Sequence, residues 1–535
     1  MTEPLGPPDA RPDARPARIP AWAPAWAPAW ASAWRPSRIP AKWRLPLAVY
    51  AACQALLLLW WAAFYPGRVT GDSLTYLYEV STSHWRSDHS VAYDSLLWLS
   101  LQLTGGVAAL TLVQTVTMAA ALAYVCVALR DLGVRGRWSA PAAVLLAAAP
   151  PTGSFVPYVW KDVAFSIAVL VAFGAVVRLT ARRMRGDQGV RDRSFTRDMV
   201  VLGLGCLGIG LFRNNGFPVI IATGALLVLL LPGMRRWMAA ATAIPLAVTL
   251  MMNNFLYPAL GVQQPRADEV YAFNYADIGV AYAKRPDTFT AADLRLMKQV
   301  APLSHWSGPG GDCHAADPLM RAPMNRMKAG RMNSQLLSLW TRILERTPTL
   351  IIDARMCRAD IAWAFTGHTG LYPASNKGLL SSWSSFGYSS AGKLPWGTTL
   401  RTRPLSTKLY RAASTSFDWT KKKQLQPLLW RGGNWSYVGY LVVLLVVARR
   451  RRYELLALAA LPIALQVTVM VANPSPLWRY MCASLFLGVL TLPALALLGG
   501  RGPVRPREPL RAAETPDAAP RPPAEGDQDT APVRG

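Results

Sequence analysis

The feature that most constrains this chain is a series of apolar segments, each about as long as a membrane is thick. Runs of about 15–23 residues contain little or no charge, the length a helix needs to cross the hydrocarbon core of a bilayer. Charged residues make up only 16% of the sequence, against roughly 25% in a typical soluble domain. We therefore predict an all-α polytopic membrane protein with about ten transmembrane helices, at 46–64, 107–129, 139–157, 163–178, 199–212, 217–233, 237–257, 434–448, 454–472 and 480–499.

Positive charge is distributed in a way that predicts the orientation of these helices. The formal net charge is +27, and Arg and Lys cluster at both ends of the chain and between apolar runs. If every cluster lies in the cytoplasm, the spans alternate in direction and both termini lie inside the cell. This predicts a multi-pass protein of the cell (plasma) membrane, with the lipid bilayer as its partner. The charge needs no nucleic acid to explain it, and we expect none.

The segments outside the spans divide the chain into five parts. We expect a disordered cytoplasmic arm rich in Pro, Ala, Trp and Arg over 1–45, a transmembrane module with outer loops over 46–257, a large extracytoplasmic domain, mixed but mainly helical, over 258–433, further transmembrane helices over 434–500, and a disordered cytoplasmic tail over 501–535. Within the large domain, the stretch around 370–420 is rich in Ser, Gly and Thr and is expected to be loop.

Two of the six cysteines, Cys313 and Cys357, lie in the predicted outer domain, and the other four lie within apolar runs. Disulfides form in oxidising compartments such as the outer face of a cell membrane. A bond between Cys313 and Cys357 is one expectation, and two free thiols are the other. No spacing resembles a zinc site, and we assign no metal ligands.

Polar residues of types that carry chemistry recur at the outer ends of the predicted spans. They lie in five short segments: YPGRVTGDS with Arg68 and Asp72, SDHS with His89, VWKD with Trp160, Lys161 and Asp162, FRNNG with Arg213, Asn214 and Asn215, and LWRY with Arg479 and Tyr480. Packing of the helices into a bundle would bring these ends together. We therefore expect one polar site at the outer membrane surface, suited to a substrate whose lipid chain stays in the hydrocarbon.

Each segment also has a purely structural interpretation. Asp72 is a candidate helix cap, with Ser73 as the competing cap. Lys161 and Asp162 would form an interfacial pair beside Trp160. The remaining residues would reach lipid head groups, close helix ends or anchor the interface, namely Arg213, Asn214, Asn215, Arg479 and Tyr480. Their shared placement on one side of the membrane favours a common site.

In these segments the chain resembles the C-type (GT-C) membrane glycosyltransferases, in particular bacterial members with a long outer domain. The likeness rests on YPG and GDS after the first span, DHS about 15 residues later, WKD, FRNNG and LWRY, and on SLWTRILERTPTLIIDARM in the outer domain. The resemblance implies that Asp72 is the catalytic base and that Asp162 is the second acidic residue. It assigns no certain cofactor and leaves a divalent cation, Mg²⁺ or Mn²⁺, as an open alternative. However, the second outer loop has no Asp-x-Asp, and Ser90 follows His89 where the family has proline, so metal dependence and the role of His89 stay open.

The implied activity is transfer of a sugar from a polyprenyl-phosphate donor to an acceptor glycan or cell-wall polymer outside the membrane. Such a reaction needs a base for the acceptor hydroxyl and cations for the departing phosphate. Arg68, Lys161, Arg213 and Arg479 are the candidate cations, with His89, Trp160, Asn214, Asn215 and Tyr480 as further substrate-binding residues. The alternatives are a multi-pass transporter or flippase, and a membrane assembly protein without enzymatic activity.

Overall fold

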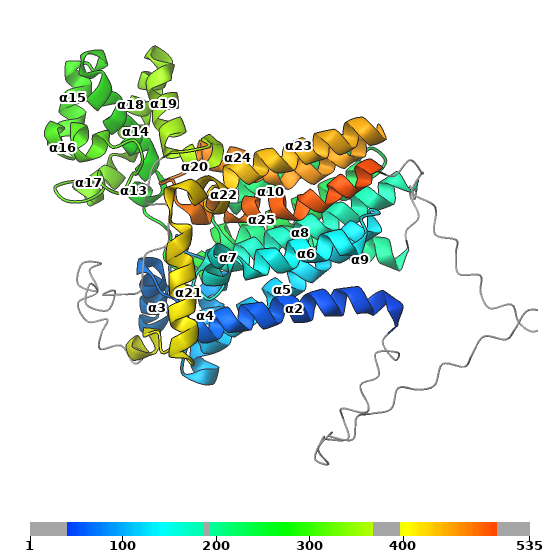
Figure 1. Ribbon diagram of the computed structural model, residues 1–535. Coiled ribbons are helices and arrows are strands. Elements are labelled where there is room, and N and C mark those ends of the chain that lie inside the picture. Colours follow the sequence, from blue (N-terminus) through cyan, green and yellow to red (C-terminus); the bar gives the residue numbers. More distant parts are fainter. Residues whose placement is uncertain (1–39, 187–191, 368–395, 500–535) are drawn as a thin grey trace, which may run out of the picture.

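The computed structural model describes residues 40–186, 192–367 and 396–499, and within these ranges the chain is helical without a β-strand (Figure 1). Most of the arm expected over 1–45 and the tail expected over 501–535 lie outside the described residues. A bundle of long helices forms the body of the molecule, and a group of shorter helices lies at one end of it.

Seven helices in the described ranges are long and apolar enough to cross a membrane. They are α2 (Ala41–Ala63), α5 (Ala108–Asp131), α8 (Lys161–Met184), α9 (Arg193–Phe212), α11 with its extension (Arg235–Ala259), α24 with the 3₁₀ turns before it (Tyr453–Val471), and α25 with the 3₁₀ turns after it (Cys482–Gly499). The prediction of a helical membrane protein therefore agrees with the fold.

The other three predicted spans coincide with helices that do not meet this length and apolarity. They are α6 (Gly136–Ala148) followed by α7 (Pro150–Phe155), α10 (Gly216–Leu230) and α23 (Gly432–Arg450). The span expected over 139–157 is interrupted at Ala149, which has an extended backbone because Pro150 follows it.

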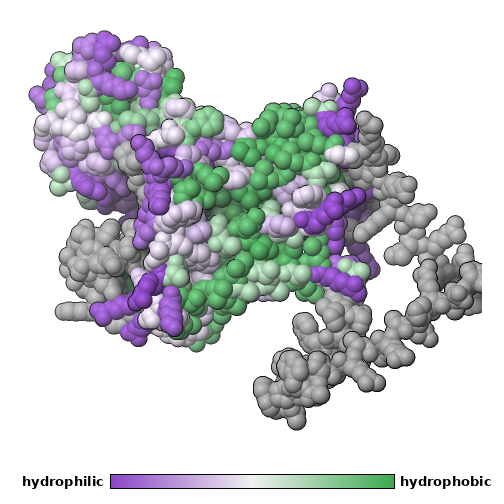
Figure 2. All heavy atoms as spheres, in the orientation of Figure 1, coloured by the Kyte–Doolittle hydropathy of each residue, from purple (hydrophilic) through white to green (hydrophobic). Residues whose placement is uncertain are grey.

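On the face shown in Figure 2, apolar side chains form a band across the middle of the bundle, and polar residues lie at its two ends. Several large apolar side chains on the bundle helices are more than half exposed: Leu145, Leu204, Ile244 and Leu441. A contiguous apolar surface of this kind is costly in water and suits contact with lipid.

The outer group of helices has a hydrophobic core of its own. It consists of α13 (Ala267–Val270), α14 (Ala272–Lys284), α15 (Ala291–Lys298), α16 (Leu303–Ser307), α17 (Arg326–Arg331), α18 (Asn333–Arg346) and α19 (Pro348–Arg358). The short helix α20 (Asp360–Trp363) follows and packs on the bundle, where Ile361 and Ala362 join the bundle core. A disulfide joins Cys313 to Cys357, with their Cα atoms 5.7 Å apart, so the structure contains the pairing and not the two free thiols. We call α13–α19 the outer domain, because it lies beyond one end of the bundle.

The structure divides the segment 258–433 differently from the single domain that the sequence suggests. Helix α21 (Thr407–Thr420) lies in the stretch expected to be loop, and it packs along α2 and α7 instead of the outer domain. Its apolar face explains this, because Leu409, Ala413 and Phe417 are spaced four residues apart on one side. With α21 the chain is already back at the bundle, and it continues there into the short helix α22 (Gln426–Leu429) and α23.

Close packing of α23 against α25 gives a test of the fold. A methyl group on Gly432 would overlap the backbone carbonyl of Met481, so Gly432→Ala is expected to lower the free energy of unfolding by about 1–3 kcal/mol. Thermal unfolding in detergent would measure it. Gly439→Ala is the matched control, because the nearest atom to its new methyl group is 3.6 Å away. Equal stability of the two variants would contradict the packing described here.

Candidate functional site

Two segments far apart in the sequence lie side by side at the end of the bundle that faces the outer domain. The backbone amide of Arg68 donates to Pro157 O at 2.9 Å, and the amide of Val159 donates to Arg68 O at 3.0 Å. This short parallel pairing joins the chain entering α3 (Gly71–Thr82) to the chain entering α8. The first turns of the two helices, which carry Asp72 and Lys161–Asp162, are thereby placed next to each other.

The local contacts exclude helix capping as the role of Asp72. The Ser73 hydroxyl accepts from the Thr70 amide at 3.1 Å and donates to Val159 O at 2.8 Å. The Thr70 hydroxyl accepts a hydrogen bond from the Trp160 indole at 2.6 Å. With the start of α3 held by Thr70 and Ser73, the Asp72 carboxylate is free to pair with the Arg479 guanidinium.

A cavity of about 340 Å³ lies where these elements meet. Nine of the residues expected at the site line it: Asp72, His89, Lys161, Asp162, Arg213, Asn214, Asn215, Arg479 and Tyr480. They come from the start of α3, the segment before α4 (Val91–Thr104), the start of α8, the turn between α9 and α10, and the turn before α25. The helix ends therefore converge as the sequence predicts.

Arg479 lies between the two acidic residues of the cavity. It pairs with Asp72, and its Nη1 atom is 3.9 Å from Asp162 Oδ2. Arg213 approaches the same Asp162 carboxylate from the other side, at 3.4 Å. Both guanidinium groups also lie over the Tyr480 ring, at 4.8 Å for Arg213 and 5.2 Å for Arg479. Only 2% of the Asp162 side chain is exposed, so this carboxylate depends on the two arginines for its charge compensation.

The pairing with Arg479 keeps Asp72 ionised. Burial in the surrounding protein acts to raise the pKa of the Asp72 carboxyl, because the charged form loses water. The positive charge of Arg479 and the hydrogen bond that it donates outweigh this effect, with smaller contributions from His89 and Lys161. The pKa of Asp72 therefore lies below its ordinary value.

Two of the expected substrate-binding residues do not line the cavity. Arg68 is buried, and its guanidinium lies over the rings of Phe64, Tyr158 and Phe417 at 4.4–4.8 Å. The assignment of Arg68 to the donor phosphate is therefore replaced by a packing role next to α21. Trp160 stacks on Tyr158 and lies beneath Arg479, so it supports the floor of the site and is almost completely buried.

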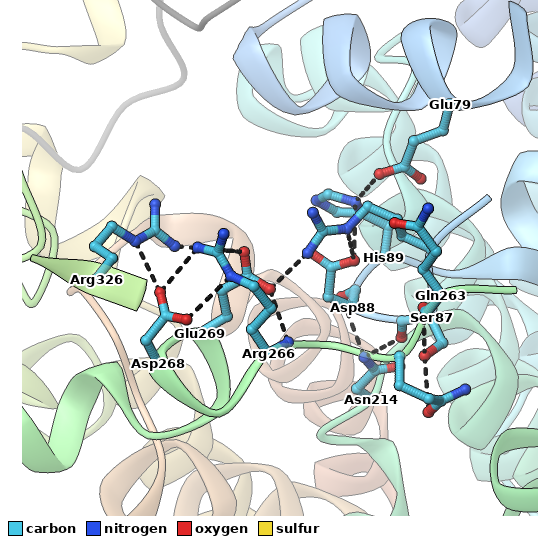
Figure 3. Close-up of polar contacts among 12 residues, drawn as sticks. Glu79, Ser87, Asp88, His89, Asn214, Gln263, Arg266, Asp268, Glu269 and Arg326 are labelled. Atoms are coloured by element: carbon cyan, nitrogen blue, oxygen red, sulfur yellow. Dashed lines mark hydrogen bonds and ion pairs between the residues drawn. The ribbon is translucent and has the colours of Figure 1, made fainter. Parts of the chain in front are cut away.

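The segment between α3 and α4 forms one wall of the cavity (Figure 3). The Asn214 amide donates to Ser87 O at 2.7 Å and to Asp88 O at 3.1 Å, which fixes this segment against the start of α10. His89 Nδ1 lies 2.8 Å from Glu79 Oε1. Asn214 therefore has a positioning role besides lining the cavity.

The outer domain supplies cavity residues that the sequence did not single out. The stretch Pro265–Phe273 contributes five of them, including Glu269, and the turn between α24 and α25 adds Pro474 to the lining. Arg86 connects this stretch to the membrane module, because it pairs with Asp88 at 2.9 Å and with Glu269 at 2.5 Å. The adjacent acidic residues Asp268 and Glu269 were the available sequence signal for this stretch. However, Arg86, the partner of Glu269, lies 183 residues away in the sequence.

Two clusters of potential metal ligands occur in the described part of the chain: Glu79–Asp88–His89 beside the cavity, and Cys313–His314–Cys357 in the outer domain. The disulfide occupies both sulfur atoms of the second cluster, so it offers no thiolate ligands. The first cluster retains carboxylate and imidazole donors.

Comparison with known proteins gives one family. The model of a family of unknown function, DUF6020, matches residues 86–306. The match includes Lys161, Asp162 and Arg213 but neither Asp72 nor Arg479. No curated protein and no solved structure matches the chain. This chain therefore contains a region similar to the DUF6020 family, which extends from the wall of the cavity into the outer domain.

Proposed function

We propose that this protein is a membrane glycosyltransferase that moves a sugar from a polyprenyl-phosphate donor to a glycan or cell-wall acceptor outside the plasma membrane. The observation that carries the proposal is the shared cavity of Asp72, Asp162, Lys161, Arg213 and Arg479 at one end of an apolar helix bundle. A carboxylate and several cations in one partly desolvated site match the two needs of the reaction.

The proposed topology has ten spans, with both termini in the cytoplasm and the cavity on the outer side. Seven of the spans are the long apolar helices, and α6–α7, α10 and α23 are the other three. Nucleotide sugars are confined to the cytoplasm, so a transferase facing outward needs a donor delivered by the membrane. A polyprenyl phosphate meets this need, because its isoprenoid stays in the bilayer while its sugar phosphate reaches the cavity.

In the proposed mechanism, the donor changes the partner of Arg479. In the arrangement described above, Arg479 pairs with Asp72 and lies near Asp162. A donor phosphate entering the cavity would accept hydrogen bonds from Arg479 and release Asp72 from its ion pair. Asp72, no longer stabilised as an anion by that contact, then becomes a stronger base.

The transfer step follows as a single displacement. Asp72 takes the proton of the acceptor hydroxyl, and the acceptor oxygen forms a bond to the anomeric carbon while the bond from that carbon to the phosphate oxygen breaks. The electron pair leaves with the phosphate, whose charge is stabilised by Arg479, Arg213 and Lys161. The configuration at the anomeric carbon is inverted.

The activity is tested by comparing envelope glycans and polyprenyl-linked sugars between a deletion strain, the wild type and a complemented strain. Loss of one glycan together with accumulation of one lipid-linked sugar, both reversed on complementation, is expected and would identify donor and acceptor. Unchanged glycans in the deletion strain would contradict the transferase and favour the transporter or assembly protein.

The topology gives a separate prediction, measured with a membrane-impermeant thiol reagent on intact cells. The background is low, because the four free cysteines are buried and the other two form the disulfide. Asp287→Cys in the outer domain is expected to be labelled, and Arg197→Cys at the start of α9 is not, although both native side chains are at least 60% exposed. The reverse pattern would place the cavity in the cytoplasm and remove the need for a lipid-borne donor.

A further inference from the structure

Glu79, Asp88 and His89 bring three potential metal ligands together beside the cavity (Figure 3). One donor atom from each lies within 4.8 Å of the other two. His89 Nδ1 is 2.8 Å from Glu79 Oε1 and 3.8 Å from Asp88 Oδ1. Ligands of a tetrahedral metal with bonds of 2.0–2.2 Å lie about 3.3 Å apart, so small side-chain rotations would suffice.

The cluster contains a buried carboxyl group that its neighbours do not fully satisfy. Glu79 is 1% exposed, and its Oε2 atom has no hydrogen-bond partner. Asp94, on α4, is also completely buried; burial and the nearby charges of Glu79 and Asp88 raise the pKa of its carboxyl well above the ordinary value, which favours its neutral form. A buried carboxylate without a partner is costly unless a proton or a cation neutralises it.

The cations already present do not meet this need. Arg86 is shared between Asp88 and Glu269, and Lys161 donates to the backbone carbonyl of Asp88 at 3.5 Å. Arg86 acts on the Glu79 carboxylate through its charge, but the hydrogen-bond partner of Glu79 is His89. An ion pair between a protonated His89 and Glu79 is the competing interpretation, and it leaves Oε2 of Glu79 without a hydrogen-bond partner.

We propose that Glu79, Asp88 and His89 bind a divalent transition-metal ion, such as Mn²⁺ or Zn²⁺. One imidazole and two carboxylates suit these ions, whereas Mg²⁺ prefers oxygen ligands alone. Asp88 and His89 line the cavity and Glu79 lies behind them, so the open coordination position faces the cavity. The site lies on the hairpin of α3 and α4, and not on the second outer loop.

The ion would add positive charge where an anionic ligand enters. The cavity lining holds four carboxylates, Asp72, Asp88, Asp162 and Glu269, against the three cations Lys161, Arg213 and Arg479. A dication at the cluster reverses this balance and favours a phosphate. This last step rests on the proposed function, whereas binding of the metal does not.

The test is metal binding by the full-length protein, purified in detergent, treated with a chelator and dialysed. Titration calorimetry with Mn²⁺ or Zn²⁺ is expected to give one site per chain. Glu79→Gln and His89→Gln should each weaken binding by at least about tenfold. His314→Ala is the matched control, because it removes a histidine from the other cluster and should leave the affinity unchanged.

Thermal unfolding of each variant without metal shows whether it folds. If a variant does not fold, Asp88→Asn is measured in its place, because the Asp88 side chain is partly exposed. Absence of a stoichiometric site, or equal affinity in all variants, would overturn the proposal. If the purified protein binds the metal but deletion leaves the glycans unchanged, the metal site is retained and the transferase is rejected. If deletion removes glycans but the purified protein binds no metal, the transferase is retained and the metal site is rejected.

Discussion

Asp72→Asn is expected to lower the rate constant of sugar transfer by about 10²–10⁴-fold, the usual contribution of a general base. The amide has the shape of the carboxylate but cannot take the proton of the acceptor hydroxyl. Thr70 and Ser73 hold the start of α3, so the helix does not depend on Asp72 for its cap. Turnover of the lipid-linked sugar by the purified variant, with donor affinity measured separately, distinguishes lost chemistry from lost binding.

Asp287→Asn is the control for this experiment, because Asp287 is an exposed carboxylate of the outer domain that pairs with Arg285. It removes the same charge without touching the cavity, and full activity is expected. Wild-type turnover in Asp72→Asn would exclude Asp72 as the base.

Arg479→Gln is expected to have the second largest effect, a decrease of about 10²–10³-fold in the rate constant, because a phosphate-stabilising donor is lost. The same change has a second, independent signature in the pH dependence. In the wild type Arg479 holds the pKa of Asp72 below its ordinary value, so Asp72 stays charged, and able to act as base, until the pH falls through that lowered pKa. Without Arg479 the effect of burial is less opposed and the pKa rises.

The acid limb of the profile of kcat/KM against pH, which reports the pKa values of the free enzyme, should therefore move to higher pH in Arg479→Gln, and less so in Arg479→Lys, which keeps the charge but not the planar fork. Arg285→Gln, on the surface of the outer domain, is the matched control. A profile in Arg479→Gln that has the wild-type midpoint would mean that Arg479 does not act on the catalytic carboxylate.

The sequence predicted the parts of this fold that depend on local composition. Apolar length identified all of the long helices, because a span is recognised without knowledge of its neighbours. The gathering of Asp72, Lys161, Arg213 and Arg479 followed from a single argument, that the outer ends of bundled helices meet. This argument could not predict contacts between distant segments: two of the three rings at the Arg68 guanidinium, Tyr158 and Phe417, lie far from it in the sequence.

Helix α21 and the outer-domain wall of the cavity also depend on contacts between segments that are distant in the sequence. Ser and Thr residues gave the stretch around 407–420 the composition of a loop, but its apolar positions match a surface on α2 that the local pattern cannot reveal. Glu269 joins the cavity because the start of the outer domain lies against it, next to Arg86 from a distant part of the sequence.

The turn between α24 and α25 attaches the outer domain to the bundle. Arg355 donates to Val471 O at 2.6 Å, Asn473 donates to Arg358 O at 2.9 Å, and the Ala316 amide donates to Pro474 O at 3.0 Å. Arg479 follows a few residues later on the same short stretch of chain. A shift of the outer domain is therefore transmitted through the backbone to the guanidinium that holds Asp72. A ligand that moved the outer domain would therefore change the affinity of the cavity for an anion, and an anion in the cavity would change the affinity for that ligand by the same factor.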